Sequence, residues 1–365
     1  MKRQLSESEE AQAQVARKVL LVKGFGGLGN RLEVVLGGML YARLSQRELV
    51  VDWSDPMYSA DGSNAFRTLF QCRSLAVSDD LSSMADSVYP AGWRGHLGES
   101  LARMGKLLGY DTDERGRQLS IDMTSLDYDE QVLVLHGFND RVEVLKQHHR
   151  RLLPELAQLE RPQILAKLLA EEIIPAPEVR RRVDDFKRTH FAGPTVGVHI
   201  RFSDYRIRLL ALLRQLNTLL KQYPDLQVFV ATDNEAMLRL IQRHYSRVIT
   251  VPHWFDPEGV ALHKSTANRD RTQSAIEALT DLYLLAECDY LVVDSASSFS
   301  YLASVLSKPK AGGIRDVNTG GKGYRFLGPK GNRRARKAIT SLMQRTRAST
   351  WGVRAFGALV PIRYL

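Results

Sequence analysis

The sequence predicts an α/β protein with two Rossmann-type domains, each built on a parallel sheet. The chain has 365 residues, which is too long for one ordinary core and suits two domains. Short apolar segments with the pattern of buried strands alternate with helical segments in two separate series along the chain. This alternation is typical of parallel sheets, which bind ligands outside the carboxyl ends of their strands.

The first series opens with a complete strand–helix–strand unit. An apolar strand is expected at 19–22, a glycine-rich turn at 24–29, a helix at 31–44 and a second strand, rich in valine, at 49–53. The first strand leads directly into the turn, so the glycines stand at its carboxyl end.

The rest of the first domain is less regular. Residues 55–127 contain many Gly, Ser and Asp residues and predict loops and short helices. A buried strand follows at 131–135, and a long helical region, interrupted at 174–177, then extends to about residue 191. We expect this domain to cover residues 18–190.

The second series predicts a domain at 191–312. Its expected strands are 195–200, 227–231, 247–251 and 290–293, and its expected helices are 209–222, 235–244, 274–286 and 299–306. Two segments are left outside the domains. They are a flexible N-terminus at 1–17 and a basic tail at 313–365 that could pack back on the first domain.

The net charge of +10 favours anionic partners such as nucleic acid, anionic lipid or phosphorylated small molecules. Much of the excess lies at 180–182 and 330–347. The first interpretation of both clusters is a solvated helix face. The alternative for the second is contact with the inner face of a membrane, because Trp351 and Phe356 follow it.

Several common classes of protein are not indicated. The polar N-terminus lacks the apolar region of a signal peptide, and no apolar run approaches the roughly 20 residues that span a bilayer. The two cysteines, Cys72 and Cys288, give neither a disulfide framework nor a metal-ligand spacing and are interpreted as buried apolar residues. We expect a cytoplasmic protein.

An imidazole, a cation and a carboxylate stand together where the strand at 195–200 ends: His199, Arg201 and Asp204. Such groups are costly at a buried strand end unless they meet a ligand or each other. A sugar-nucleotide transferase has a use for all three, with the arginine on the diphosphate and the carboxylate facing the acceptor. The alternative is a strand-to-loop corner with a solvated ion pair.

The turn at 24–29 satisfies the pattern G-x-G-x-x-G of dinucleotide-binding proteins, and Asp52 stands near the end of the next strand. Asn30 and Arg31 follow at once, so this helix start could instead hold an anion or hydrogen-bond a sugar. A tight turn that needs positive φ is the structural alternative. The candidate residues on this side are Gly26, Gly27, Gly29, Asn30, Arg31 and Asp52.

Two later strands also end in polar residues. Asp233 and Asn234 follow the strand at 227–231, and a carboxylate there can accept hydrogen bonds from the N1–H and exocyclic amine of guanine. Asp233 could equally cap the next helix. The serines at 295–300 place hydroxyls and free N–H groups at a helix start, which suits a diphosphate. The polar loop at 253–266 could close over a ligand or be an ordinary surface loop.

Together these motifs resemble the family of GDP-fucose-dependent α1,6-fucosyltransferases, and most closely its rhizobial nodulation-factor branch. The resemblance extends over most of residues 18–310. It depends on the order and spacing of the following motifs: His199-x-Arg201-x-x-Asp204, Ala231-Thr-Asp-Asn234, Asp281-x-Tyr-Leu-Leu with Asp289 and Ser297-Ser298, Gly24-Phe-Gly, Ser63-Asn-Ala-Phe66, and Phe255-x-Pro257 with Leu262-His263-x-Ser265.

The resemblance implies a GT-B-like fold of two facing Rossmann-type domains and an inverting, metal-independent transfer of fucose from GDP-fucose without a cofactor. Arg201 would bind the diphosphate and Asp233 would read the guanine. The donor-binding residues would be His199, Asp233, Asn234, His263, Ser295, Ser297 and Ser298. The partners would be a nucleotide-sugar donor and a carbohydrate acceptor, chitin-oligosaccharide-like or another bacterial glycan, and not nucleic acid.

Asp204 is the expected base that accepts the acceptor's hydroxyl proton, with Asp52, Asp256 and Glu258 as alternatives. Animal members of the family have another acidic residue shortly after the Asp204 position, and this chain has none there. Two other functions remain open. One is an NAD(P)-dependent oxidoreductase that uses the turn at 24–29, and the other is a non-catalytic protein that binds polyanions through its basic tail.

Overall fold

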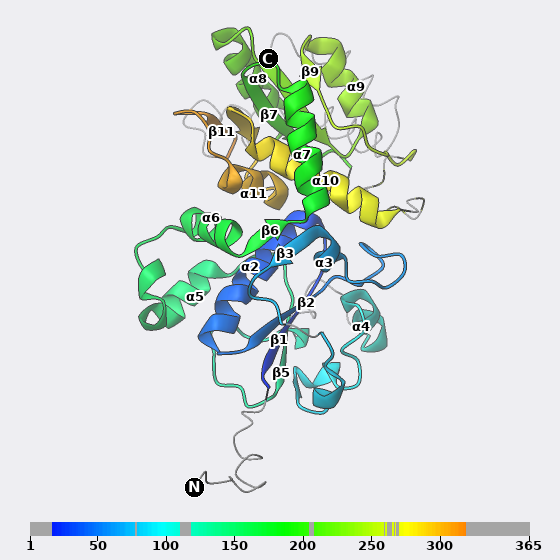
Figure 1. The fold of residues 1–365 in the computed structure, drawn as a ribbon, viewed down its shortest axis with the longest axis vertical. Helices are drawn as coiled ribbons and strands as arrows, with labels where there is room; N and C mark the ends of the chain where they lie inside the picture. The colour runs from blue at the N-terminus through cyan, green and yellow to red at the C-terminus, as the bar shows by residue number, and fades with distance from the viewer. Residues whose placement is uncertain are drawn as a thin grey trace, which may run out of the picture. The chain divides into compact units, whose positions relative to one another are not determined.

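The computed structural model describes residues 17–76, 79–109, 118–203, 208–258, 260, 265, 267 and 270–318. The predicted flexible N-terminus and nearly all of the predicted basic tail lie outside these residues. The chain divides into two compact units (Figure 1). The first unit contains Met1–Gly26, Asn30–Asp55 and Cys72–Ile164, and the second contains Gly27–Gly29, Pro56–Gln71 and Leu165–Leu365.

The first unit contains a four-stranded parallel sheet in the order β2-β1-β5-β4. Its strands are β1 (Val19–Lys23), β2 (Glu48–Asp52), β4 (Val88–Tyr89) and β5 (Val132–Leu135). Its helices include α4 (Leu101–Leu107) and α5 (Val142–His149), and α2 (Leu28–Leu44) and α6 (Arg161–Glu171) lie partly in it. One face of the sheet packs against Trp93 and Met104, both fully buried.

The second unit contains a five-stranded parallel sheet in the order β11-β10-β7-β8-β9. The strands are β7 (Thr195–Ile200), β8 (Gln227–Thr232), β9 (Val248–Ile249), β10 (Tyr290–Val293) and β11 (Ile314–Asp316). The helices are α3 (Ala65–Leu69), α7 (Pro177–His190), α8 (Leu209–Gln222), α9 (Glu235–His244), α10 (Arg271–Ala286) and α11 (Ser298–Leu306). A separate two-stranded sheet pairs β3 (Phe70–Cys72) with β6 (Ile173–Pro175).

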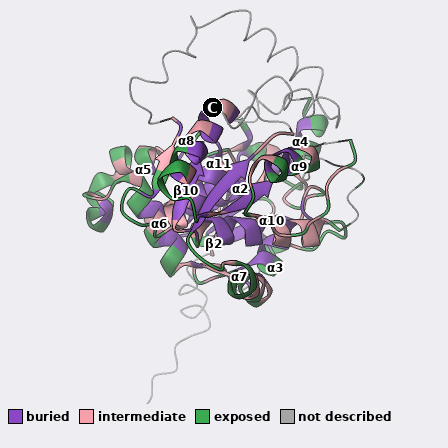
Figure 2. Ribbon diagram, turned by 90° about the horizontal axis from the view of Figure 1, so that it is seen from above, coloured by how far each residue is buried: buried purple, intermediate pink, exposed green. Residues whose placement is uncertain are grey.

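The strand order of the second sheet locates its ligand-binding edge. From β7 the chain adds β8 and then β9 on one side, and it then crosses to β10 on the other side of β7. β7 and β10 are buried along their whole length, and β10 lies in the purple centre of Figure 2. In open α/β sheets the crevice for a ligand lies at such a reversal, outside the carboxyl ends of the strands. Those ends are Ile200 and Val293.

The local sequence explains why these elements form. β7 and β10 are apolar runs buried on both faces, as strands in the middle of a parallel sheet are. Gly197 allows β7 to lie close to α10, because a Cβ atom there would be 3.0 Å from Cδ2 of Leu285 on that helix. α8 buries one apolar stripe that includes Leu212, Leu216 and Leu219.

Several segments differ from the prediction. α2 and α10 each begin three residues earlier than predicted. The helical region before residue 191 is interrupted near 174–177 as predicted, where the chain forms β6, and it is also broken by 3₁₀ turns at Arg150–Leu152 and Pro154–Leu156, because Pro154 has no N–H for a helical hydrogen bond. The region predicted as loops and short helices also contains β3 and β4. Residues Ile314–Asp316, predicted as part of the tail, form β11 and pair with β10.

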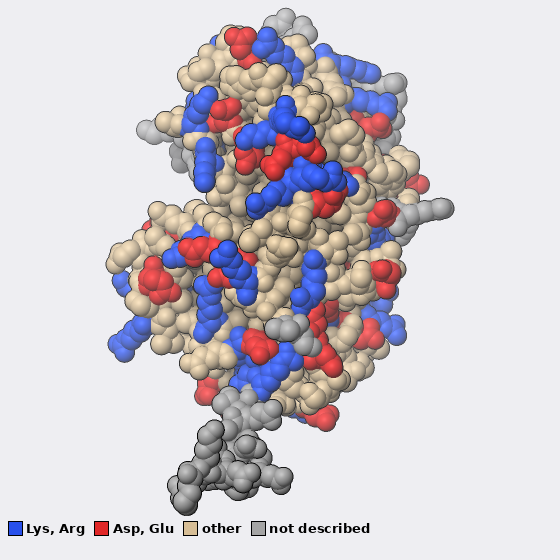
Figure 3. Space-filling view, in the orientation of Figure 1, with Lys and Arg blue, Asp and Glu red and all other residues tan. Residues whose placement is uncertain are grey.

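The basic cluster at 180–182 lies on α7, where acidic residues balance it. Arg182 Nε is 2.7 Å from Glu178 Oε1, and Arg181 also bonds Glu178. Figure 3 shows blue and red side chains interspersed on this face. Among the described residues, no helix is long and apolar enough to cross a membrane. Cys288 is buried and Cys72 is half-buried.

Candidate functional site

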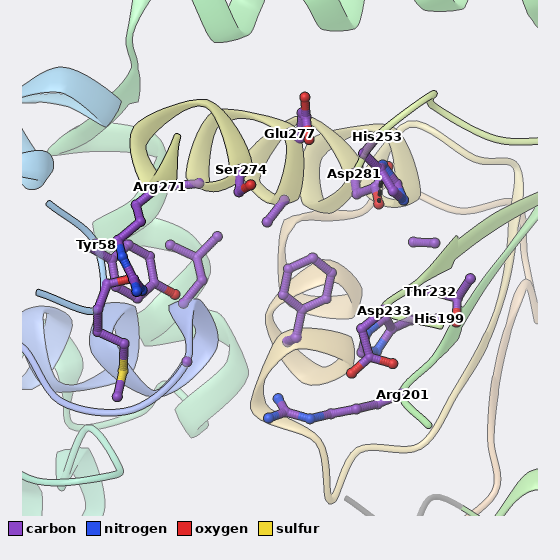
Figure 4. Close-up of a pocket in the computed structure, with 17 residues that line it drawn as sticks. Tyr58, His199, Arg201, Thr232, Asp233, His253, Arg271, Ser274, Glu277 and Asp281 are labelled. Atoms are coloured by element: carbon purple, nitrogen blue, oxygen red, sulfur yellow. Dashed lines mark hydrogen bonds and ion pairs between the residues drawn. The ribbon is translucent and has the colours of Figure 1, made fainter. Parts of the chain in front are cut away.

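A pocket of the second unit lies at the edge where β7 and β8 end (Figure 4). Its lining includes His199 and Arg201 from the end of β7, Thr232 and Asp233 from the end of β8, and Phe299 from α11. One face of α10 forms a long wall, because Arg271, Ser274, Ala275, Ala278 and Asp281 recur at helical spacing and all line the pocket. Gly27, Leu28, Met57 and Tyr58, which belong to the same unit, also line it, as do Ala231, His253 and Glu277.

His199 is a buried, neutral connector between β7 and α11. Its Nδ1 lies 2.8 Å from the hydroxyl oxygen of Ser300, and its ring packs against that of Phe299 at 4.6 Å. Burial, and then the charge of Arg201, lower the pKa of His199 to about 3. The imidazole is therefore uncharged at neutral pH, and it positions the first turn of α11 at the pocket.

Arg201 points from the end of β7 toward the glycine-rich turn. A Cβ atom on Gly27 would lie 3.6 Å from a guanidinium nitrogen of Arg201. Figure 4 shows the guanidinium extended along the lower side of the pocket. Asp204, the expected base, lies outside the described residues and stays a prediction.

The N-termini of α2 and α11 meet beside this guanidinium. A Cβ atom on Gly29 would be 2.5 Å from the backbone nitrogen of Phe299 and 2.7 Å from the carbonyl carbon of Ser298, so only a glycine fits there. The first N–H groups of a helix have no partner within the helix, and a helix N-terminus has a partial positive charge of roughly one half. Two such ends and a guanidinium repel one another, and an anion between them would relieve the repulsion.

The serines play different parts at the start of α11. Ser297 is the N-cap residue, and its side chain makes no capping hydrogen bond. Ser298 is the first helical residue, in contact with Gly29. Ser295 binds the chain instead, because its hydroxyl accepts from Asn318 Nδ2 at 3.3 Å and its backbone N–H donates to Asp316 at 3.2 Å. The structure thus brings Ser297 and Ser298, more than Ser295, to the helix end.

Asp233 lines the pocket, but both of its carboxylate oxygens already bind the chain. Oδ1 accepts from the backbone N–H of Phe202 at 2.8 Å, and Oδ2 accepts from the hydroxyl of Ser203. The N-cap of α9 is Asn234, whose side chain accepts from Met237 N at 2.9 Å, and the interpretation of Asp233 as the cap is wrong. An extended Asn234 backbone places the side-chain oxygen over the helix start, and Asp233 is one residue too early to do this.

A second carboxylate of the pocket, Asp281, has an oxygen without a partner. Oδ1 of Asp281 is buried and makes no hydrogen bond with the described residues. Neither ring nitrogen of His253 makes a hydrogen bond of ordinary geometry with those residues. His253 Nδ1 is 4.0 Å from Asp281 Oδ2. Burial, and then Glu277, raise the pKa of Asp281 well above its ordinary value, and burial lowers that of His253. A buried carboxylate oxygen without a hydrogen-bond partner among the described residues indicates a ligand with hydrogen-bonding edges.

The opposite end of the pocket contains Tyr58 and Arg271 (Figure 4). Arg271 donates to the carbonyl of Met57 at 3.4 Å and to that of Ser265 at 3.1 Å. Within the described part of the chain it makes no ion pair, so its charge is not neutralised by a carboxylate. His263, from the same loop as Ser265, lies outside the described residues.

The glycine-rich turn itself is occupied by side chains of the first unit. A Cβ atom on Gly24 would lie 2.1 Å from Arg31, which is fully buried and holds Asp55 with two hydrogen bonds of 2.7 and 2.8 Å. Arg31 Nε also donates to the carbonyl of Gly26, whose φ is +72°. These contacts place Arg31 in a structural ion pair and leave its guanidinium unsuited to a pyrophosphate.

Asp52 is likewise engaged within the first unit. Its carboxylate pairs with Lys23 and accepts from Ser54. Burial alone would raise the pKa of Asp52, but Lys23 and Ser54 hold this pKa below its ordinary value. An ionised, paired Asp52 is a poor base and a poor ribose ligand. Asp256, another alternative base, binds Glu258 N at 2.8 Å and the hydroxyl of Ser265, which fixes its loop, and Glu258 is exposed.

The sequence analysis named Asp281 in a motif of the resemblance and His253 in the loop at 253–266, without giving either side chain a role of its own, and it did not single out Tyr58 or Arg271. A signal for Asp281 was present, because it shares one face of the predicted helix at 274–286 with Ser274, Ala275 and Ala278. Arg271 stands three residues before that predicted start, and the structure places it on the same helix. The acid Asp281 inside the largely apolar stretch from Ala278 to Leu285 is a second signal. Nothing in the chain indicates that Tyr58 would lie near Arg271.

No family model matches the chain. Two curated relatives, both named nodulation protein Z, are similar in sequence. The one from Azorhizobium caulinodans is 25% identical over 311 residues, which are 77% of this chain and 86% of that protein. The one from Bradyrhizobium diazoefficiens is 27% identical over 137 residues, which are 33% of this chain and 36% of that protein. The resemblance inferred from the motifs is confirmed.

A solved structure of NodZ α-1,6-fucosyltransferase soaked with GDP-fucose is similar in fold. Its TM-score is 0.54 at 21% sequence identity, over 80% of this chain and 93% of that chain. At this level of identity the likeness concerns the fold. The predicted α/β, GT-B-like fold with parallel sheets is confirmed.

Proposed function

We propose that this protein, a glycosyltransferase homologous to nodulation protein Z, transfers fucose from GDP-fucose to a carbohydrate acceptor with inversion and without a metal ion. The observation that carries the proposal is the meeting of the α2 and α11 N-termini beside Arg201, in a pocket with an unpartnered acid at one end. A nucleoside diphosphate sugar has complementary parts, a hydrogen-bonding base and a diphosphate.

The base end of the pocket is assigned to Asp281 and His253. A carboxylate with a free oxygen can accept from both the N1–H and the exocyclic amine of guanine, whereas adenine presents no such pair of donors. Asp281 has that free oxygen, and the carboxylate of Asp233 is already held by Phe202 and Ser203. We therefore move the guanine-reading role from Asp233 to Asp281.

The diphosphate is assigned to Arg201 and the two helix N-termini. When the glycosyl–phosphate bond breaks, positive charge develops on the sugar and negative charge on the departing GDP. Fixed donors that face this developing charge lower the barrier without reorganisation. Here the guanidinium of Arg201 and the N–H groups of the first turn of α11, which begins at Ser298, supply them, which is the role that a bound cation has in other transferases.

In the proposed reaction the acceptor's hydroxyl oxygen forms a bond to C1 of fucose on the face opposite GDP. The bond from C1 to the β-phosphate oxygen breaks, and the hydroxyl proton passes to a carboxylate. This inverts the configuration at C1. Asp204 remains the predicted base because it follows Arg201 by three residues. We assign donor binding mainly to the domain predicted at 191–312 and acceptor binding to that at 18–190.

The experiment is incubation of the full chain with GDP-fucose and a chitin oligosaccharide, with and without a chelator, followed by mass spectrometry and NMR of the product. We expect a mass gain of one deoxyhexose, an inverted linkage and full activity with the chelator. GDP, but not NAD, should raise the melting temperature. Stabilisation by NAD alone would instead support the oxidoreductase, and retention of configuration would refute the single displacement.

A further inference from the structure

The first sheet has a ligand-binding edge of its own. From β1 the chain adds β2 on one side and later adds β4 and β5 on the other, so the strand order reverses between β1 and β5, which lie side by side (Figure 1). In open α/β sheets a ligand binds at such a reversal, outside the carboxyl ends of the strands. Those ends are Lys23 and Leu135.

Two aromatic rings meet at this reversal. Phe25 follows the end of β1 by two residues, and Phe138 follows the end of β5 by three. Their ring centroids are 5.0 Å apart and their planes are inclined by 67°, which is an edge-to-face contact. Phe25 packs against the core of the first unit, whereas Phe138 is 46% exposed. A single exposed apolar side chain is ordinary, but this one lies at the edge where the sheet would bind a ligand.

The loop that carries the exposed ring is held in place. Phe138 lies between β5 and Asp140, which is 2% exposed. The carboxylate of Asp140 accepts from Arg161 at 2.6 Å and from the backbone N–H of Val142 at 2.9 Å. The backbone of Asp140 also packs on α2, because a Cβ atom on Gly37 would lie 1.9 Å from its carbonyl oxygen. A ligand that stacks on Phe138 therefore has little loop motion to arrest.

A polar side chain lies beside the two rings. A Cβ atom on Gly26 would be 3.2 Å from the amide nitrogen of Asn30 and 3.8 Å from Cε1 of Phe138. An apolar ring next to an amide is complementary to a sugar, because the C–H groups of a pyranose form an apolar face and its hydroxyls surround that face. An apolar protein segment would instead bury the amide against carbon atoms.

We infer that Phe25 and Phe138 form an aromatic platform on which a sugar ring of the acceptor stacks. This inference rests on the proposed function, in which the first domain binds the acceptor. Phe138 presents the stacking surface, and Phe25 fixes its orientation from the glycine-rich turn. Neither ring can take up a proton or carry a charge, so the platform contributes to acceptor binding and not to the chemical step.

The test is calorimetric titration of the GDP-saturated full chain with chitin tetraose, followed by steady-state kinetics with the same acceptor. Phe138→Ala should raise the Kd and the KM for chitin tetraose by about 3- to 10-fold, because the exposed half of the ring loses its contact. kcat and the Kd for GDP should stay unchanged, because neither ring lines the donor pocket.

Two further variants serve as controls. Phe138→Trp keeps an aromatic face and should keep the affinity for chitin tetraose. Leu152→Ala removes an apolar side chain of the same unit that is 58% exposed, and it should bind chitin tetraose as the wild type does. Melting temperatures check the folding of each variant, and Phe138→Gln, which replaces the ring with a polar side chain, repeats the test if Phe138→Ala is unstable.

The outcomes separate the two claims. An unchanged Kd for chitin tetraose in the folded Phe138 variants, or no binding of chitin tetraose by the wild type, would overturn the platform and leave the donor side of the proposed function intact. Loss of a dimer in Phe138→Ala, measured by sedimentation, with unchanged affinity for chitin tetraose would assign the ring to contact with a second copy of the chain and would also overturn the platform. No binding of GDP itself would overturn both claims.

Discussion

His199 Nδ1 lies 2.8 Å from the hydroxyl of Ser300 and so joins the end of β7 to the first turn of α11. The contact is buried, because His199 and Ser300 are 8% and 0% exposed. It fixes the N-terminus of α11, which belongs to the proposed diphosphate site, relative to β7, which leads into Arg201. Burial and the charge of Arg201 disfavour the protonated imidazole, so the folded state should become less stable when His199 takes up a proton.

The first prediction concerns pH and stability. The pKa of His199 is lowered to about 3 in the folded chain from 6.5. Between pH 3 and 6.5 the unfolded state therefore binds more protons than the folded state. The contribution of His199 to the free energy of unfolding is fully present above pH 6.5 and is lost as the pH falls toward 3. The slope from this group should approach about 1.4 kcal/mol per pH unit. Urea unfolding at several pH values should show this slope in the wild type and a smaller one in His199→Gln. Equal slopes would contradict the prediction.

The second prediction concerns base recognition. Asp281→Asn should weaken GDP binding by about 10- to 100-fold. The amide oxygen can accept only one of the two guanine hydrogen bonds, and the amide NH₂ group then faces the other guanine donor. Binding of ADP, measured in the same titration, should stay weak and change little. Glu287→Gln, at the C-terminal end of α10 and outside the pocket lining, is the matched control and should retain GDP affinity.

The same acid predicts how GDP affinity varies with pH. Burial raises the pKa of Asp281 in the free protein, and guanine needs the carboxylate, so binding should release a proton. GDP affinity should therefore rise with pH through the raised pKa and then level off. Titrations in buffers of different ionisation enthalpy measure the proton directly. Proton uptake on binding would contradict the assignment.

The third prediction concerns leaving-group stabilisation. Arg201→Ala should lower kcat by about two to three powers of ten while the protein stays folded, and Arg201→Lys should recover only part of the loss, because an ammonium lacks the planar fork. Arg239→Ala, an exposed arginine on α9 paired with Glu235, is the control and should be as active as the wild type. More than a tenth of wild-type activity in Arg201→Ala would remove this residue from the mechanism.

The fourth prediction concerns the glycine-rich turn. Asp55→Asn leaves the fully buried Arg31 without its carboxylate and should lower the free energy of unfolding by about 3 kcal/mol or more. Chemical denaturation measures this loss. The Kd for GDP of the folded fraction should stay near that of the wild type, because neither residue lines the pocket. A large change in Kd without loss of stability would assign Arg31 to the ligand.

The sequence allowed the second domain to be predicted in more detail than the first. β7, α8, α9 and β10 have the predicted bounds because each is a clean apolar or amphipathic run between polar residues. β3, β4 and β6 were missed because such short strands depend on pairing partners far away in the chain. Ile173 pairs within a two-stranded sheet that no local pattern indicates.

The candidate site was predicted in part. Strand ends pointed to His199, Arg201 and Asp233, and all three line the pocket. The pattern could not tell that Asp233 would be held by Phe202 and Ser203, because those bonds depend on how two loops meet. The sequence pattern also could not show that the glycines of the turn at 24–29 have two different roles. Gly24 makes room for Arg31, and Gly29 makes room for α11.

The central claim is that the pocket of the second unit binds GDP through Asp281 and Arg201. The most direct measurement is a crystal structure of the full chain with GDP. The account predicts the guanine N1 within hydrogen-bonding distance of the Asp281 carboxylate and the diphosphate against Arg201 and the start of α11. A nucleotide bound at the turn beside Arg31 and Asp52, with this pocket empty, would contradict it.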